Sequence, residues 1–364
     1  MPRVLAFIEA LGVTGPVRNL LRTAGSVDLH LATYRRGCAR RVHHEGVDAL
    51  VDAARIRGVP VHVLGERHAF DPALLWRIAR AIRAVGPHVV QTHNVKSHAL
   101  VACLPSRPRW VAFHDGYTDT DRKQRLYNRI DRWTLRRADA VVATCGAFAD
   151  DLAAAGVDRR RISVLHNAVE PPRPIEMERA RRALWLDRDY TVVAIGRLSR
   201  DHGHDLLIDA CAALPPGLRE RTMLVIAGDG PEHAALVRRA AARGVRLRMD
   251  GYHEDVRAWY AAADAFVLPS RSEGSPNGLL EAFAAGCAVV AAGVGGVPEI
   301  AEDGVSAWLV PGSDARALAG GIEAVLTDAN LAARLRQGAL AAAARFTPAA
   351  RASALHALYA QVQA

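Results

Sequence analysis

The sequence is poor in aromatic residues and cysteines, and it has no long uninterrupted apolar run. Aromatics make up 5% of the 364 residues although half are hydrophobic. Such a composition suits buried parallel sheets flanked by helices better than a β-sandwich. No run of about 18 apolar residues occurs, so a membrane span is not expected. The five cysteines lack the spacing of a zinc site or redox pair, which predicts free buried thiols in a reducing cytoplasm.

Two common classes of protein find little support. The apolar run Val4–Ile8 meets Glu9 and then Gly12, so it is interpreted as a first buried strand and not as a signal peptide. The loop that follows lacks the G-x-G-x-x-G spacing of dinucleotide sites, which disfavours an oxidoreductase. The excess of arginine has no aromatic platform beside it, which disfavours a nucleic-acid-binding protein.

The positive charge is unevenly distributed. The net charge is +9, and only two of the 47 basic residues are lysines. Residues 1–173 hold 27 basic and 16 acidic side chains, whereas residues 174–364 hold 20 and 22. The first half is therefore expected to meet an anionic surface or substrate more readily than the second half.

Both halves alternate short apolar runs with amphipathic stretches of helical period. This pattern predicts an α/β chain with two doubly wound, Rossmann-like domains, each with a parallel sheet. The expected strands are Val4–Ile8, Val27–Ala32, Val61–Leu64, Val89–Thr92, Trp110–Phe113, Ala140–Ala143 and Ile162–Leu165, then Thr191–Ile195, Met223–Ala227, Val245–Met249, Ala265–Leu268, Ala288–Ala291 and Ala307–Val310.

A proline-rich segment separates the two halves. Residues 170–174 hold three prolines, which remove backbone donors as expected of a linker. We expect a first domain over residues 1–173 and a second over 174–345. The last helical stretch, 346–364, follows the final strand–helix unit, and a return to the first domain is one interpretation of it.

The segment 269–283, PSRSEGSPNGLLEAF, follows an apolar strand and leads into a helix. In a doubly wound sheet, ligands bind at the carboxyl ends of strands. Gly274 and Gly278 permit close backbone approach, and the free N–H groups around residues 277–280 suit a phosphate. The carboxylates of Glu273 and Glu281 are better used on sugar hydroxyls. The alternative is a helix cap with a solvated glutamate.

At this segment the chain resembles the family 4 retaining glycosyltransferases of the two-domain glycosyltransferase-B fold. That family carries an E-x7-E motif, and Glu273 and Glu281 have this spacing. The resemblance extends over residues 191–312 through Ile195-Gly196-Arg197-Leu198-Ser199, Gly228-Asp229-Gly230-Pro231 and Gly295-Gly296-Val297-Pro298-Glu299. It implies that the two domains face one another across a cleft.

The resemblance also implies roles for the second domain. Glu281 would hold the donor ribose, Glu273 the transferred sugar, and Arg197 the diphosphate, whose oxygens a guanidinium matches well. A surface salt bridge is the other interpretation of Arg197. The expected catalytic residues are His114, Glu273 and Arg197. The expected donor-binding residues are Gly15, Arg197, His202, Gly230, Glu273, Gly274, Asn277, Gly278, Leu279 and Glu281.

One position departs from the family pattern G-R-L-x-x-x-K-G. His202 stands where the family has a lysine that provides a second diphosphate cation. An imidazole can donate to phosphate, but near neutral pH it is only partly protonated unless the phosphate favours its charge. A sugar-nucleotide-binding protein without catalysis is therefore kept as an alternative, suggested by His202 alone.

The first half resembles the family more weakly, at three places. Residues 12–18 look like its glycine loop after the first strand, residues 91–94 end a strand with Lys96 just beyond, and residues 113–116 resemble its active-site histidine motif. The resemblance implies that His114 contacts the transferred sugar. The alternative is that His114 is a histidine packed in the core, and this alternative has more weight for His93. The expected acceptor-binding residues are Gly12, Asn94, Lys96 and Asp115.

Residues 121–138 form a basic amphipathic stretch. Leu126, Ile130 and Trp133 with Tyr127 share one helical stripe, and seven basic residues surround it. In an ordinary domain helix this stripe packs into the core while the arginines are solvated. The other interpretation is a helix that lies on an anionic membrane.

The resemblance thus implies a retaining glycosyltransferase of the hexosyltransferase type, which we expect to be metal-independent. It would move sugar from a nucleotide-sugar co-substrate to a hydroxyl acceptor: a lipid-linked molecule, a glycan precursor or a small molecule. No cofactor is expected; Asp119-Thr120-Asp121 and Asp187-Arg188-Asp189 have D-x-D spacing but are interpreted as surface acids. The expected location is the cytoplasm, with the inner membrane face as an option. A nucleotide-sugar epimerase on the same scaffold is an alternative.

Overall fold

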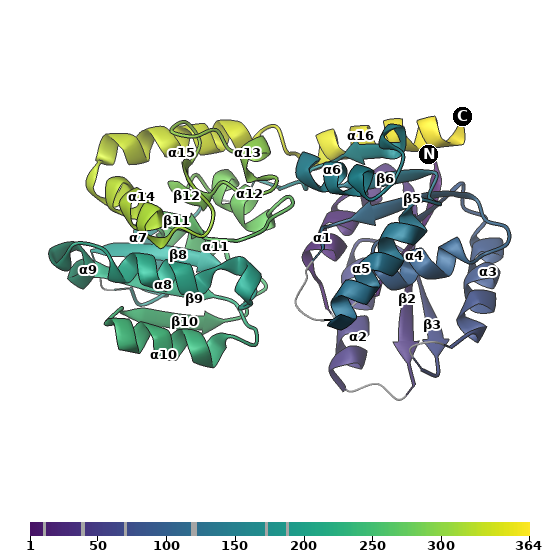
Figure 1. Ribbon diagram of the computed structural model, residues 1–364, viewed down its shortest axis with the longest axis horizontal. Coiled ribbons are helices and arrows are strands. Elements are labelled where there is room, and N and C mark those ends of the chain that lie inside the picture. The colour runs from purple at the N-terminus through teal and green to yellow at the C-terminus, as the bar shows by residue number, and fades with distance from the viewer. Residues whose placement is uncertain (10–11, 38–40, 69–70, 118–121, 172–173, 187–188) are drawn as a thin grey trace. The chain divides into compact units, whose positions relative to one another are not determined.

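The computed structural model describes residues 1–364 except 10–11, 38–40, 69–70, 118–121, 172–173 and 187–188. The chain divides into two compact units. The first comprises Met1–Ala168 and Pro348–Ala364, and the second comprises Val169–Thr347. Figure 1 shows the elements of each unit by label and by position along the chain.

The first unit contains a parallel sheet in the strand order β3-β2-β1-β4-β5-β6-β7. Its strands are β1 (Arg3–Phe7), β2 (Asp28–Arg36), β3 (Val61–Glu66), β4 (Val89–Thr92), β5 (Arg109–His114), β6 (Ala140–Ala143) and β7 (Ile162–Val164). Its helices are α1 (Gly15–Arg22), α2 (Arg41–Ile56), α3 (Ala73–Val85), α4 (Val95–Ala102), α5 (Arg122–Leu135), α6 (Gly146–Ala154) and α16 (Pro348–Gln363), with 3-10 turns η1 (Ala24–Ser26) and η2 (Arg159–Arg161).

Two hydrophobic cores cover the two faces of this sheet. One joins the sheet to α1, α2 and α16 through residues such as Leu20, Leu50 and Leu355. The other joins it to α3, α4, α5 and α6 through residues such as Ile78 and Leu135. Because both faces are covered, every residue of the central strands β4 and β6 is buried.

Helix α16 is the last element of the chain, and it packs on the first unit (Figure 1). The hydroxyl of Tyr359 donates to Oε1 of Gln91 in β4 at 2.6 Å, and both side chains are buried. The guanidinium of Arg351 donates to the carbonyl oxygen of Leu165 at 3.2 Å, just after β7. These polar contacts fix the helix in addition to the apolar contacts of Leu355 and Tyr359.

The second unit contains a parallel sheet in the order β10-β9-β8-β11-β12-β13. Its strands are β8 (Tyr190–Ile195), β9 (Thr222–Ala227), β10 (Leu247–Gly251), β11 (Ala265–Leu268), β12 (Val289–Ala292) and β13 (Trp308–Val310). Its helices are α7 (Met177–Ala183), α8 (His204–Ala212), α9 (Pro216–Arg221), α10 (His233–Arg243), α11 (Arg257–Ala262), α12 (Asn277–Ala284), α13 (Val297–Ile300), α14 (Ala315–Thr327) and α15 (Ala329–Ala343), with the 3-10 turn η3 (Arg200–His202).

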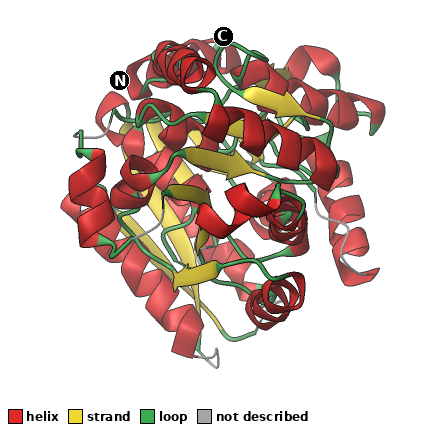
Figure 2. Ribbon diagram, turned by 90° about the vertical axis from the view of Figure 1, so that its left-hand side faces the viewer, coloured by secondary structure: helices red, strands yellow, loops and turns green. Residues whose placement is uncertain are grey.

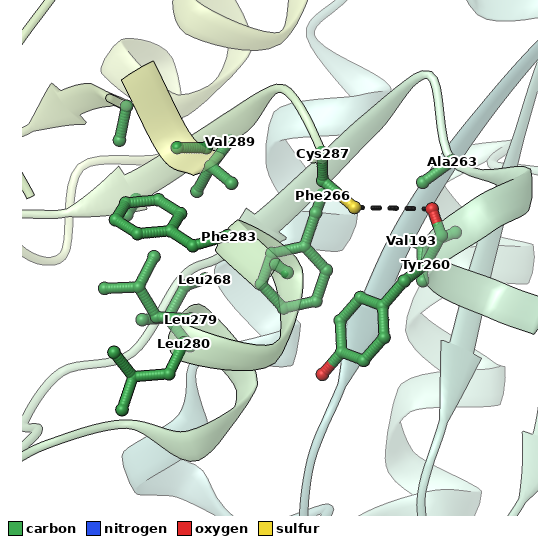
Figure 3. Packing of buried hydrophobic residues seen from close by; sticks show 14 of the residues in the cluster. Val193, Tyr260, Ala263, Phe266, Leu268, Leu279, Leu280, Phe283, Cys287 and Val289 are labelled. Carbon is green, nitrogen blue, oxygen red and sulfur yellow. Dashed lines mark hydrogen bonds between the residues drawn. The ribbon is translucent and has the colours of Figure 1, made fainter. Parts of the chain in front are cut away.

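Helices flank the strands of this unit, as Figure 2 shows by secondary structure. One face carries α8, α10 and α14, and the other carries α7, α11 and α12. Figure 3 shows the second of these cores, where Phe266 of β11 packs between α11 and α12. Its ring lies 5.3 Å from that of Tyr260, and the Cys287 thiol donates to the Tyr260 carbonyl oxygen at 3.3 Å.

The prediction of two doubly wound parallel sheets is confirmed. Each apolar run named from the sequence lies within or overlaps a strand, and all pairings between the named strands are parallel. The prediction that the cysteines are buried is wrong at Cys103, which is exposed; Cys145, Cys211 and Cys287 are buried, and Cys38 lies outside the described residues. Among the described helices, none combines the length and apolarity needed to cross a bilayer.

Candidate functional site

Four loops meet at the carboxyl edge of the sheet in the second unit. They follow β8, β9, β11 and β12, and glycines allow their backbones to touch. A Cβ atom on Gly228 would overlap the carbonyl oxygen of Gly196, and one on Gly203 would overlap that of Pro269. One on Gly295 would overlap that of Glu273. No side chain larger than hydrogen fits at these crossings.

Backbone hydrogen bonds fix the same loops to one another. The N–H of Leu198 donates to the carbonyl oxygen of Asp229 at 2.9 Å. The N–H of Arg271 donates to the backbone carbonyl oxygen of Asp201 at 2.8 Å. The N–H of Gly296 donates to the carbonyl oxygen of Glu273 at 3.1 Å. The loop after β8 is thus connected to the loops after β9 and β11, and the loop after β11 to the loop after β12.

Glu273 lies where these loops converge, with its side chain 13% exposed. Its Oε1 atom accepts a hydrogen bond from the Ser270 hydroxyl at 2.7 Å. The same oxygen lies 3.5 Å from Nδ1 of His202, which comes from the loop after β8. The structure therefore brings two of the expected donor-binding residues into direct contact.

Glu281 lies within α12 and has different surroundings. Its Oε2 atom accepts a hydrogen bond from the hydroxyl of Tyr260 in α11 at 3.2 Å. Helix α12 begins at Asn277, and the N–H groups in the first turn of an α-helix point out of the helix end. A Cβ on Gly278 would lie 3.6 Å from the carbonyl oxygen of Ile195, so this helix end packs against the end of β8. The Leu279 side chain is buried in the core, which leaves only its backbone for a ligand.

Arg197 and Gly230 also lie in this loop region. Arg197 is exposed, and no carboxylate in the described part of the chain forms an ion pair with it. Gly230 packs so closely on Leu198 that a Cβ would overlap its carbonyl oxygen. Arg271, by contrast, is committed to Asp205 through two hydrogen bonds of 2.8 Å.

A second histidine, His204, lies beneath this region at the start of α8. It is 2% exposed, and burial lowers its pKa to about 4. The centre of its ring lies 6.3 Å from that of His202. Its Nε2 atom would lie 3.9 Å from a Cβ atom placed on Gly196. A neutral imidazole therefore supports the loop that carries Arg197.

In the first unit, His114 ends β5 and is 4% exposed. Burial lowers its pKa to about 4, so the ring is neutral at neutral pH. Its ring packs against those of Tyr117 at 4.2 Å and Phe148 at 5.9 Å. Gly116 has a φ of 102°, a left-handed conformation that turns the chain back so that Tyr117 reaches His114.

The expected acceptor residues Asn94 and Lys96 have structural partners. The side-chain Oδ1 atom of Asn94 caps α4 by accepting a hydrogen bond from the N–H of Ser97 at 2.9 Å. The Lys96 ammonium lies 2.5 Å from the buried carboxylate of Glu66 and 3.3 Å from Glu9. The charge of Lys96 is therefore already balanced within this unit.

The other expected residues of the first unit lie in loops and at helix starts. Gly12 has a φ of 141°, Gly15 is the first residue of α1, and Asp115 is exposed directly after β5. His93 stacks on Phe113 at 4.8 Å, and burial lowers its pKa to about 3. The surroundings of His93 are those of a packed histidine.

The interpretation of α5 as an ordinary domain helix with its apolar stripe in the core is wrong. Leu126, Ile130 and Trp133 are 55%, 37% and 52% exposed. The buried face of the helix holds instead Asn128 and Asp131 together with Thr134 and Leu135. An apolar stripe thus lies on the outside, beside exposed arginines.

Some expectations fall on residues that are not described. The described residues do not include the first D-x-D segment, Asp119-Thr120-Asp121, or residues 187–188 of the second. They also do not include linker residues 172–173. Within the rest of the chain, no group of three or more potential metal-ligating His, Cys, Asp or Glu side chains is found.

Sequence reasoning missed the groups that hold the expected site residues. Ser270 lies within the quoted motif, and its spacing of three residues from Glu273 was a signal. Tyr260 lies 21 residues before Glu281, and Asp131 lies near His114 only because α5 packs on β5. Neither of these long-range contacts has a signal in a single sequence.

Comparisons with known proteins agree over both units. The family described as Glycosyltransferase Family 4 matches residues 18–173, and that described as Glycosyl transferases group 1 matches residues 176–341. A lipopolysaccharide core biosynthesis mannosyltransferase, LpcC of Rhizobium leguminosarum bv. viciae, is 32% identical over 83% of this chain and 88% of its own length.

Two further relatives are matched over shorter regions. A 2-deoxystreptamine glucosyltransferase of Streptomyces kanamyceticus is 31% identical over 63% of this chain. A D-inositol 3-phosphate glycosyltransferase of Frankia alni is 36% identical over 54% of it. The chain spans 62% and 49% of the lengths of these two proteins, less than two thirds.

Solved structures share the fold. Anabaena Alr3699/HepE, in complex with UDP and glucose, superposes with a TM-score of 0.86 and 20% identity over 99% of this chain and all of that chain. WaaG, a glycosyltransferase involved in lipopolysaccharide biosynthesis, superposes with a TM-score of 0.73 and 17% identity over 96% of this chain and 99% of that chain.

Proposed function

The chain belongs to the family 4 glycosyltransferases, and on this premise we propose that it transfers a sugar from a nucleotide-diphospho-sugar to a hydroxyl acceptor with retention of anomeric configuration. The observation that carries the proposal is the convergence of four loops at one sheet edge, where the loop that contains Arg197 meets the loop that contains Glu273. Parallel α/β sheets bind ligands at this edge.

The proposed roles follow from the chemistry of each group. The Arg197 guanidinium and the N–H groups at the start of α12 would hold the diphosphate and stabilise the charge that develops on it as the leaving group departs. Glu273 would accept hydrogen bonds from the transferred sugar, and Glu281 from the ribose. No metal is needed in this scheme, because the phosphate charge is met by the guanidinium and the amides.

Retention would follow from attack on the same face of the sugar. A leaving phosphate oxygen would take the acceptor proton as the new glycosidic bond forms and the bond to phosphate breaks. His114 would contact the transferred sugar from the first unit, where it is buried and neutral. Exclusion of water by the bound acceptor would limit donor hydrolysis.

We infer a uridine diphosphate sugar as the first donor to test, because the structure of Anabaena Alr3699/HepE contains UDP and glucose. For the acceptor, the relatives that act on lipopolysaccharide core and on 2-deoxystreptamine support a glycan precursor, a lipid-linked molecule or a small polyhydroxylated molecule. Lys96 is balanced by Glu66 and Glu9, which favours an acceptor group that is not anionic at that position.

Incubation with UDP-, GDP- and ADP-hexoses and an acceptor panel tests the activity. The expected product is a glycoside whose anomeric configuration, read by NMR, is that of the donor. An inverted product would contradict the retaining mechanism. An epimerised nucleotide-sugar formed without acceptor would establish the epimerase alternative, and donor binding without turnover would establish the non-catalytic one.

We also propose that α5 places the protein on an anionic membrane surface. Leu126, Ile130 and Trp133 are exposed on the helix, and Arg125 and Arg129 are exposed beside them. Apolar side chains that insert at the headgroup level, flanked by arginines, match an anionic lipid surface in both polarity and charge.

Vesicle sedimentation tests this surface. The protein is expected to pellet with vesicles containing anionic lipid at low salt and to be released at high salt, whereas neutral vesicles leave it in the supernatant. The variant Trp133→Ser is expected to pellet less than wild type, while Trp76→Ser, an exposed tryptophan on α3, is the matched control. Equal recovery with both vesicle types would remove the proposal.

A further inference from the structure

The carboxylate of Asp131 lies against His114 in the first unit. Asp131 belongs to α5 and is 1% exposed. Its Oδ1 atom accepts a hydrogen bond from Nδ1 of His98 at 2.6 Å, and its Oδ2 atom accepts one from the Tyr117 hydroxyl at 3.0 Å. Oδ2 also lies 3.8 Å from Nδ1 of His114. Side chains from α4, β5 and the loop after β5 thus surround one carboxylate.

Asp131 and His98 are both buried and hydrogen-bonded to each other. The other ring nitrogen of His98, Nε2, lies 3.3 Å from the carbonyl oxygen of Thr92, so both ring nitrogens face oxygen acceptors. Burial raises the pKa of Asp131, but the charge and hydrogen bond of His98 outweigh burial and the net pKa lies below its usual value. The carboxylate is therefore charged.

The carboxylate decides where the single hydrogen of the neutral His114 ring resides. A neutral imidazole carries hydrogen on Nδ1 or on Nε2, and its neighbours select between them. At 3.8 Å the contact is too long for a hydrogen bond, yet in a buried setting a negative charge strongly favours a hydrogen on the nearer nitrogen. Burial opposes protonation of the ring as a whole, and so does the charge of Arg132, whose guanidinium lies 4.6 Å from the centre of the Tyr117 ring.

We propose that Asp131 is a positioning residue that holds His114 in the tautomer with hydrogen on Nδ1, so that Nε2 accepts a hydrogen bond from a hydroxyl of the transferred sugar. The identity of the ligand rests on the proposed function, whereas the tautomer does not. Burial of a carboxylate has a desolvation cost, so the place of Asp131 beside His114 is better explained by positioning than by stability. The outer face of α5 holds the apolar stripe, and its inner face serves the site.

The tautomer is measured directly by long-range ¹H–¹⁵N correlation spectra of the full chain labelled with ¹⁵N-histidine. The spectrum of His114→Gln identifies the signals of His114 by their loss. The proposal predicts a protonated Nδ1 and an unprotonated Nε2 in the wild type. A wild-type ring with hydrogen on Nε2 overturns the proposal without any variant of Asp131 being needed.

The variant Asp131→Asn keeps the shape of the side chain and removes its charge. It is expected to shift His114 toward the other tautomer and to lower kcat by roughly 10- to 100-fold, with little change in the donor KM, as for other residues that orient a functional histidine. Asp71→Asn is the matched control, because Asp71 is also buried in the first unit, at 2% exposure, and pairs with Arg67 and Arg77. It is expected to leave both the tautomer and kcat as in the wild type.

Failure of the positioning role of Asp131 can be distinguished from failure of the proposed function. An unchanged tautomer in Asp131→Asn, or a changed tautomer with wild-type turnover, overturns the positioning role. The expected tautomers without transfer from any donor would overturn the proposed function while the effect of Asp131 on His114 stands. If Asp131→Asn does not fold, Tyr117→Phe removes the neutral neighbour of the carboxylate, and retention of the Nδ1 hydrogen there supports the assignment to Asp131.

Discussion

At the scale of single residues, the two glutamates of the E-x7-E motif are held in different ways. Glu273 lies in a loop and accepts from Ser270, whereas Glu281 lies inside α12 and accepts from Tyr260. Each carboxylate keeps further acceptor capacity for a ligand hydroxyl. Arg197 differs from nearby Arg271, because Arg271 is already paired with Asp205.

The variant Arg197→Ala is expected to lower turnover by roughly 100-fold or more, because it removes a charge-assisted donor from the leaving diphosphate. Arg200→Ala, in the next exposed turn, is the control and should stay within a few-fold of wild type. Steady-state kinetics with the best donor measure both. Equal losses in the two variants would argue that the effect is general charge and not a diphosphate contact.

The variant His202→Lys is expected to retain or improve donor binding. A lysine restores the permanently charged group that the family has at this position, and its ammonium can still pair with Glu273, which lies 3.5 Å from His202. Calorimetric titration of the donor into both proteins measures the change in Kd. A large loss of affinity in the lysine variant would show that His202 does not lie at the diphosphate.

The sequence revealed the residues whose signal is local and missed those whose signal is long-range. Glu273 and Glu281 were found because loop and helix follow one another directly along the chain. Asp131 was not found, because its contact with His114 depends on how α5 packs against β5, across 17 residues of sequence. The outward orientation of Trp133 was also missed, since helical period alone does not say which face is buried.

At the scale of elements, strands were predicted well because they are short apolar runs between turn residues, and because both faces of each sheet are buried. Their boundaries shifted by a few residues where a polar residue joins the ladder, as at Arg35 and Arg36 in β2, which pair with Gly65 and Glu66. The loop crossings at the candidate site depend on glycines, so they give the most direct test of its geometry.

The variant Gly203→Ala is expected to open the contact between the loops after β8 and β11. Gly203 has a φ of 66°, and a Cβ there would overlap the carbonyl oxygen of Pro269. Gly244 has a nearly equal φ of 63° but open space around it, so Gly244→Ala carries only the conformational cost. The difference in unfolding free energy between the two variants should be about 1–3 kcal/mol.

Donor affinity should fall in Gly203→Ala and stay unchanged in Gly244→Ala, because Gly244 ends α10 on the side away from these crossings. Chemical denaturation and donor titration of both variants measure the two effects. If the two alanine variants lost equal stability, the close approach of Gly203 to Pro269 would not exist in solution.

At the scale of the whole molecule, burial keeps a neutral histidine at the candidate site of each unit, and it also lowers the pKa of His93 in the first unit. Burial lowers the pKa of His114 in the first unit and of His204 in the second to about 4. In the unfolded chain both would titrate near pH 6.5, so the unfolded state binds more protons between these two values. The contribution of these histidines to the free energy of unfolding is therefore fully present above about pH 6.5, and it is lost as the pH is lowered toward 4.

The loss should be on the order of 2 kcal/mol for each histidine at pH 5 and about 3 kcal/mol at pH 4. Denaturant unfolding at pH 7.5, 6, 5 and 4 measures it. The variants His114→Gln and His204→Gln should each flatten the pH dependence of the unit that they occupy. A wild-type stability that is constant over this range would contradict the burial of both rings.

The proposed function depends most on the binding of a nucleotide-diphospho-sugar at the sheet edge of the second unit. A thermal-shift panel of UDP-, GDP- and ADP-sugars measures this most directly. At 100 times its Kd, the matching donor should stabilise the wild type by about 2.7 kcal/mol, while Arg197→Ala and Glu281→Gln should show little stabilisation at the same concentration. No stabilisation by any nucleotide-sugar, or equal stabilisation of the wild type and both variants, would contradict it.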